Sequence, residues 1–200
     1  MTDTAELVVG FDLDMTLVDS RAGIVACMHH ALGKHGGSAT DEELWPLIGA
    51  PLYDNLALFL PEEKVEAAAQ DYRAAYLIDA VDMTTAMPGS HDLLAAIHER
   101  GGRVVVVSAK VQTAITAVLD HVGLSPDEVV GDLFAEAKAR GLQEHGATAY
   151  VGDHAGDMRA ARTAQVPGIG VTTGPHDAAT LREAGATYVV DGLADVLALV

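Results

Sequence analysis

Two short acidic segments contain the side chains whose types and spacing could do chemistry. Asp12 and Asp14 follow the apolar run LVVGF, and Asp153 and Asp157 follow the strand-like segment ATAYVG. Residues two apart on a strand point to the same side, so Asp12 and Asp14 would lie together if the strand continued. Paired carboxylates are costly unless a cation lies between them or one holds a proton. The first solution makes a Mg²⁺ site and the second makes a nucleophile with a general acid. Taken alone, such a pair also fits a solvated loop or a helix cap.

A third segment places a small hydroxyl residue between a strand and a helix. Ser108 and Ala109 follow the apolar run RVVVV and precede a stretch with helical spacing. Backbone N–H groups at such a junction, together with the Ser108 hydroxyl, could hold phosphate oxygens. A serine in this position is also a common helix cap, so the segment alone does not decide between the two roles.

The charge of the chain restricts its ligands. The formal net charge is −17, and lysine occurs only at positions 34, 64, 110 and 138. A nucleic-acid surface needs clustered lysine and arginine, so we expect no nucleic-acid partner. An acidic protein that binds an anion needs local positive charge, which a metal ion and one lysine could supply.

Apolar runs alternate with helical patterns along most of the chain. Strands are expected at 7–11, 103–107, 129–130, 147–151, 168–172 and 187–190, and helices at 91–100, 111–122, 134–145, 154–164, 177–184 and 191–200. Strands that are apolar throughout and alternate with helices indicate a parallel sheet covered on both faces. The predicted fold class is therefore α/β, with a Rossmann-like parallel sheet core.

One stretch breaks this alternation. Between Ser20 and Ala86 only helical patterns occur, at 24–35, 41–48, 52–59 and 62–79. We therefore expect a core domain at 1–19 and 87–200 and an inserted all-helical cap domain at 20–86. An insertion directly after the first strand would lie over the carboxyl ends of the sheet, where open α/β sheets bind ligands. The alternative is that these helices only extend the layers of the fold.

Taken together and in order, these segments resemble a known superfamily. FDLDMTLVDS, VVVVSAK, Lys138 and YVGDHAGDMRAA resemble the four motifs of the haloacid dehalogenase superfamily. The helical insertion, with its segment IGAPLYDNL, is similar to the C1-type cap of the phosphoglycolate phosphatase branch. The resemblance covers nearly the whole chain.

The resemblance implies a role for each motif residue. Asp12 would be the nucleophile that forms an aspartyl-phosphate. Asp14 would protonate the leaving oxygen and then activate water, while its backbone carbonyl binds Mg²⁺. Asp153 would bind the metal together with Asp12, with Asp157 in support. The phosphoryl group would be bound and its charge offset by the remaining motif residues, Ser108, Ala109 and Lys138.

Three positions bear on how closely the chain follows the family. Met15 occupies a position where the motif usually has glycine, so a side chain must be accommodated in the first loop. The frequent Lys-Pro pair of the third motif is absent, which leaves Lys110 as a rival to Lys138. Thr16 completes a D-x-D-x-T pattern, which resembles that of the phosphatases.

The resemblance implies a Mg²⁺-dependent phosphatase acting on a small phosphorylated metabolite, with phosphoglycolate as one candidate. A sugar-phosphate mutase of the same superfamily is the enzymatic alternative. A non-catalytic, receiver-like phosphate-binding module is the alternative from another class. A dinucleotide site is excluded, because no G-x-G-x-x-G follows the first strand.

The remaining features predict where such an enzyme would act. No apolar run reaches the roughly 18 residues of a membrane span, and the amino terminus lacks the order of a secretion signal. The single cysteine, Cys27, fits a reducing compartment. We therefore expect a cytoplasmic protein without a membrane partner, present as a monomer or homodimer.

Overall fold

The buried valine-rich runs form the middle of a parallel sheet. In the computed structural model, which describes residues 6–200, β1 (Val8–Phe11) lies between β4 (Arg103–Val107) and β6 (Ala149–Gly152). The flanking strands β5 (Glu128–Val130), β7 (Gly168–Val171) and β8 (Tyr188–Val190) complete the order β5-β4-β1-β6-β7-β8. Every pairing in this sheet is parallel. The carboxyl ends of all six strands therefore meet at one edge.

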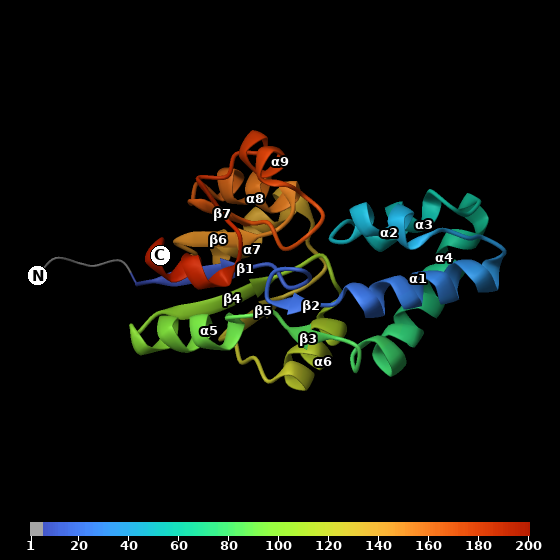
Figure 1. Cartoon of the computed structure of the whole chain (residues 1–200), viewed down its shortest axis with the longest axis horizontal. Coiled ribbons are helices and arrows are strands. Elements are labelled where there is room, and N and C mark those ends of the chain that lie inside the picture. The colour runs from blue at the N-terminus through green and yellow to red at the C-terminus, as the bar shows by residue number, and fades with distance from the viewer. Residues whose placement is uncertain (1–5) are drawn as a thin grey trace, which may run out of the picture.

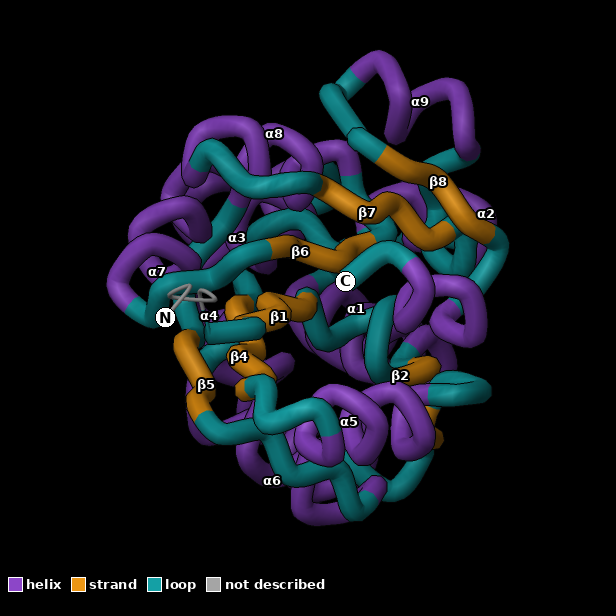
Figure 2. The backbone as a smooth tube through the Cα atoms, turned by 90° about the vertical axis from the view of Figure 1, so that its left-hand side faces the viewer, coloured by secondary structure: helices purple, strands orange, loops and turns teal. Residues whose placement is uncertain are grey.

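Helices cover both faces of the sheet, as Figures 1 and 2 show. One face carries α5 (Ser90–Glu99), α6 (Gln112–Val122) and the 3₁₀ helix η4 (Leu193–Ala198), and the other carries α7 (Lys138–Glu144), α8 (Ala155–Ala164) and α9 (Ala178–Glu183). Alternate residues of β4 belong to the two cores: Val104 and Val106 pack with the first group, and Val105 and Val107 with the second. The predicted Rossmann-like α/β core is confirmed.

The inserted helices gather beyond the carboxyl ends of the strands, at the right of Figure 1. They are α1 (Arg21–His35), α2 (Asp41–Leu44), η1 (Trp45–Leu47), α3 (Leu52–Ala57), α4 (Glu62–Ala75) and the π-helical turn η2 (Tyr76–Ala80). The division into a core domain and a cap domain at 20–86 remains a prediction. The first five residues of the predicted core lie outside the described part of the chain.

Several predicted elements differ in type or length. The helix expected at 191–200 is a 3₁₀ helix at Leu193–Ala198, preceded by the extended Gly192. The helix expected at 41–48 changes to 3₁₀ geometry at Trp45, next to a proline. A short antiparallel pair, β2 (Val18–Asp19) with β3 (Thr85–Ala86), was not predicted, because two-residue strands are too short to show a period. This pair joins the two points where the chain enters and leaves the insertion.

The helix expected at 134–145 begins as a separate 3₁₀ turn, η3 (Ala135–Ala137), before α7. Lys138 is thereby the first residue of α7, and this placement brings it to the edge of the sheet where β1 and β6 end. Within residues 6–200, no helix is both long and apolar enough to cross a membrane.

Candidate active site

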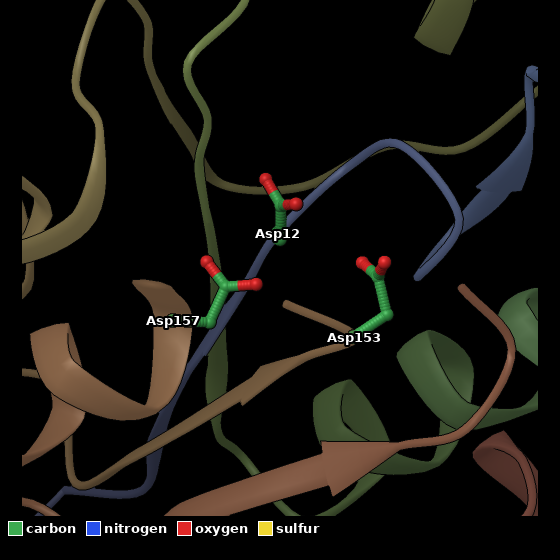
Figure 3. Close-up of side chains that lie close together, drawn as sticks. All are labelled: Asp12, Asp153 and Asp157. Carbon is green, nitrogen blue, oxygen red and sulfur yellow. The ribbon is translucent and has the colours of Figure 1, made fainter. Parts of the chain in front are cut away.

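Three buried carboxylates meet where adjacent strands end. Asp12 follows β1, Asp153 follows β6, and Asp157 lies in the first turn of α8. Figure 3 shows their side chains lying close together. One oxygen from each lies within 4.8 Å of the others, and each residue is 3 % exposed or less. Hard oxygen donors in this number are the ligands that Mg²⁺ prefers.

Asp157 is positioned by the start of its own helix. Its Oδ2 accepts a hydrogen bond from the His154 N–H at 3.1 Å, which forms a capping box with the His154 ring. Its Oδ1 accepts from Lys138 Nζ at 2.7 Å and from the Tyr150 hydroxyl at 3.3 Å. Both oxygens therefore already have partners, and Asp157 orients its neighbours as much as it adds charge.

Lys138 connects two members of the carboxylate cluster. Its Nζ donates to Asp12 Oδ1 at 2.9 Å and to Asp157, and the residue is 2 % exposed. Burial works to lower the pKa of the Lys138 ammonium, but the charges of Asp12 and Asp157 together raise it well above its usual value. Lys138 is therefore cationic, and it offsets part of the negative charge around Asp12.

The cluster remains short of positive charge. Burial raises the pKa of Asp12 to about 6, against the lowering effect of Lys138. Burial, with Asp12 and Asp157 nearby, raises the pKa of Asp153 well above its usual value. Thr16 Oγ1 donates to Asp153 Oδ1 at 2.8 Å, whereas the buried Asp153 Oδ2 has no hydrogen-bond partner among residues 6–200. A divalent cation would supply both the missing partner and the missing charge, so the residues present fit a Mg²⁺ ion.

Asp14 lies beside this cluster but its side chain is held separately. Ser20 Oγ donates to Asp14 Oδ1 at 2.6 Å, and Lys110 Nζ lies 3.3 Å from Asp14 Oδ2. Lys110 also lies 3.8 Å from the ring centre of Tyr76 in the insertion. The two rival lysines therefore contact different aspartates: Lys138 contacts Asp12, and Lys110 contacts Asp14.

The first loop accommodates Met15 in an unusual backbone conformation. Its φ is +58°, in the left-handed region where glycine is normally preferred, and its side chain is buried in the core. The Met15 N–H donates to the Val18 carbonyl at 2.8 Å, and its carbonyl accepts from Thr173 Oγ1 at 2.5 Å. Packing of the Met15 side chain and these two hydrogen bonds stabilise a backbone conformation for which the family motif usually has glycine.

The Ser108 segment lines the same cavity as Asp12 and Asp14. The Ser108 N–H donates to the Val130 carbonyl at 3.0 Å, and the Lys110 N–H donates to Ser108 Oγ at 3.3 Å. The predicted phosphate contact through backbone N–H groups therefore depends on Ala109.

Comparison with known protein families identifies the family of this chain. The model of one protein family, described as haloacid dehalogenase-like hydrolase, matches residues 9–171. The chain belongs to this family. The match contains all four motif segments and the whole insertion.

Individual relatives of this haloacid dehalogenase-like hydrolase cover nearly its full length. The Dickeya dadantii protein named "Probable phosphatase IndB" is 32 % identical over 94 % of this chain and 90 % of its own length. A protein named phosphoglycolate phosphatase from Caulobacter vibrioides is 30 % identical over 94 % of this chain and 88 % of its own. A solved haloacid dehalogenase-like family protein from Streptococcus pneumoniae has a TM-score of 0.88, 24 % identity, and coverage of 98 % of this chain and 99 % of its own. This last similarity shows the fold.

Three residues around the site of this hydrolase were not predicted from the sequence. Ser20, Tyr150 and Thr173 each bond a loop or carboxylate of the site. Thr173 lies far along the chain from the first motif, and Tyr150, although it begins the fourth motif, has the apolar character expected of a buried strand residue. Ser20 ends the segment FDLDMTLVDS and Tyr150 begins YVGDHAGDMRAA, so their places in these motifs were the signals available.

His154, next to Asp153 in the chain, is the residue that caps α8. Its Nδ1 accepts from the Gly156 N–H at 2.9 Å, and burial lowers the pKa of its imidazole to about 4. The ring is therefore neutral and caps α8.

Proposed function

We propose that this hydrolase is a Mg²⁺-dependent phosphatase that cleaves a small phosphate monoester through an aspartyl-phosphate at Asp12. The observation that carries the proposal is the position of the Asp12 carboxylate. It is buried, contacts Lys138, and faces two further carboxylates at the edge of the sheet where ligands bind in this class of fold. The names of the two relatives, both phosphatases, support this chemistry.

The reaction divides into two displacements at phosphorus. In the first, a carboxylate oxygen of Asp12 attacks, the bond from phosphorus to the ester oxygen breaks, and Asp14 gives its proton to the departing alcohol. In the second, a water oxygen attacks the aspartyl-phosphate and gives a proton to Asp14. The bond from phosphorus to Asp12 then breaks and phosphate leaves. The sum is one ester and one water converted to one alcohol and one phosphate.

The electrostatic problem in this mechanism is the approach of two anions. Two unit charges 4 Å apart repel by about 4 kcal/mol at an effective dielectric constant near 20. Asp12 and Asp153, with Asp157 in support, would hold Mg²⁺, and the ion would neutralise part of this charge when bound. Lys138 donates a hydrogen bond to Asp12 and offsets part of its charge. Ser108 and Ala109 would bind phosphoryl oxygens.

The inserted helices, as a cap domain at 20–86, would close over the site. They line the cavity that contains Asp12 and Asp14, and Lys110 of the core already contacts Tyr76 of the insertion. A closed cap excludes water and limits the size of the ester. Phosphoglycolate is the reference substrate, because the relative from Caulobacter vibrioides has that name.

The proposal is tested by phosphate release from a panel of small phosphate esters, with Mg²⁺, with Ca²⁺, and after EDTA treatment. We expect release with Mg²⁺ and strong loss with EDTA, with Ca²⁺ inhibitory because its longer and looser coordination does not suit an octahedral site. Full activity after exhaustive EDTA treatment would overturn the metal dependence. Isomerisation of a sugar phosphate without net phosphate release would indicate the mutase instead.

A further inference from the structure

The cavity above Asp12 extends well beyond the space that a phosphate group needs. Its volume is about 550 Å³, and it is bounded by the strand ends on one side and by the inserted helices on the other. Ligand pockets of roughly 300–1,000 Å³ hold molecules considerably larger than a two-carbon acid. The part of the cavity formed by the insertion therefore indicates which alcohol portion of an ester would fit.

The walls contributed by the insertion are apolar and aromatic. Aliphatic side chains come from α1, α2, η1 and α3, namely Ile24, Met28, Leu44, Leu47 and Leu52. Three tyrosines add aromatic rings to this part, Tyr53, Tyr72 and Tyr76, of which the last two have ring centres 5.9 Å apart. Such walls stabilise a bound group by removing apolar surface from water.

The cations that line the cavity already have partners. Lys110 lies against Asp14 and over the Tyr76 ring. The Arg73 guanidinium lies 5.3 Å from the ring centre of Tyr53 and donates to its hydroxyl at 3.4 Å. Asp12, Asp14 and Asp132 also line the cavity. These three carboxylates outnumber the two cations of the lining, and Lys110 is already paired with Asp14, so a second anionic group on a substrate would meet a net negative wall.

The Tyr76 hydroxyl is buried within the wall of the cavity. Tyr76 is 2 % exposed, and its hydroxyl has no hydrogen-bond partner within residues 6–200. Because this hydroxyl has almost no accessible surface, it adds no polar contact to the cavity, and the Tyr76 ring is the part that a ligand meets. The cavity is suited to an apolar body that carries at most neutral polar groups.

We propose that the substrate is a phosphate monoester of an uncharged alcohol with a bulky apolar or aromatic body, in preference to a doubly anionic ester such as phosphoglycolate. The inference rests on the proposed phosphatase activity and specifies its substrate class. The phosphate lies at Asp12, and the alcohol portion lies among the tyrosines and leucines of the insertion.

The test compares three esters of alkyl alcohols, so that the leaving oxygens are of one kind: 2-phenylethyl phosphate, ethyl phosphate and phosphoglycolate. We expect kcat/KM for 2-phenylethyl phosphate to exceed that of each of the other two by about 30-fold, from burial of the phenyl group. A ratio below about threefold, with phosphate release from the small esters, overturns the substrate class but leaves the phosphatase function standing. No release from any of the three overturns the proposed function and the inference with it.

A matched pair of variants locates the effect. Leu47 lines the cavity, whereas Leu58, in the turn directly after α3, is 64 % exposed and outside the cavity lining. In Leu47→Ala the ratio of kcat/KM for 2-phenylethyl phosphate to that for ethyl phosphate should fall about tenfold, and in Leu58→Ala it should stay at the parent value. Equal ratios in both variants and the parent overturn the placement. If Leu47→Ala fails to fold by thermal melting, Leu52→Ala is the replacement.

Discussion

Lys138 is the residue on which the charge balance around Asp12 depends. It contacts Asp12 and Asp157 directly, whereas Lys110 contacts Asp14. We predict that Lys138→Ala lowers kcat/KM, with a rise of at least about 3 kcal/mol in the corresponding activation free energy. This size is typical for loss of a preorganised charge-stabilising group. Lys110→Ala should cost much less. Steady-state kinetics of both variants, with thermal melting as the folding control, would check this. A severe loss in Lys110→Ala beside a nearly silent Lys138→Ala would contradict the assignment.

The ionised side chain of Asp153 lowers the stability of the folded protein until a cation is bound. Its folded-state pKa lies well above the usual 3.8. The folded protein then binds more protons than the unfolded chain between these two values, so stability falls as pH rises through that window. We predict that Asp153→Asn raises the free energy of unfolding of the metal-free protein at pH 7.5 by at least about 1 kcal/mol, and that the difference disappears near pH 3.

Urea denaturation across pH, in EDTA and in Mg²⁺, measures this effect. Mg²⁺ should stabilise the parent by binding its folded state, and should stabilise Asp153→Asn far less. A variant that is less stable than the parent in EDTA at pH 7.5 would contradict the predicted cost of the Asp153 carboxylate, and equal stabilisation of both proteins by Mg²⁺ would contradict its role in metal binding.

The junction between β6 and α8 sets the position of Asp157 and, through it, of Lys138. A Cβ atom added at Gly152 would lie 2.4–2.5 Å from the Asp157 side chain, so only glycine fits at the end of this strand. We predict that Gly152→Ala costs about 2 kcal/mol of stability or more and also lowers kcat. Urea denaturation and steady-state kinetics would check both effects.

Gly33 supplies the control for that substitution. It lies in the exposed part of α1 with nothing within 4 Å of an added Cβ, so Gly33→Ala should stabilise the protein by about 0.5–1 kcal/mol. Equal changes in the free energy of unfolding in Gly152→Ala and Gly33→Ala would contradict the close approach at Gly152.

At the scale of elements, the strands that are buried on both faces were predicted best from the sequence. The valine run of β4 was predicted with its bounds, because a parallel strand buried on both faces is apolar throughout and ends at a polar residue. The pair of β2 with β3 and the 3₁₀ geometry at the carboxyl end were not predicted. Their form depends on contacts with distant segments, which no local period records.

At the scale of the molecule, parallel topology explains which residues of the candidate site could be predicted from the sequence and which could not. Asp12, Ser108 and Asp153 each follow a strand. These strands are parallel neighbours in the sheet, so the residues after them lie at the same edge. The choice between Lys110 and Lys138 could not be predicted in this way, because it depends on how α7 and its preceding turn pack. The tyrosines of the cavity were likewise hidden, since their approach to the core depends on how the insertion folds back.

The central claim is that Asp12 carries the phosphoryl group during turnover. The most direct measurement is to quench the enzyme in acid during turnover of its best ester, reduce the protein with borohydride, and map the product by mass spectrometry. An aspartyl-phosphate is reduced to homoserine, so homoserine is predicted at position 12, only in samples that received substrate, and not in Asp12→Asn. Homoserine at another aspartate, or rapid turnover with none at position 12 under conditions that trap acyl phosphates, would contradict the account.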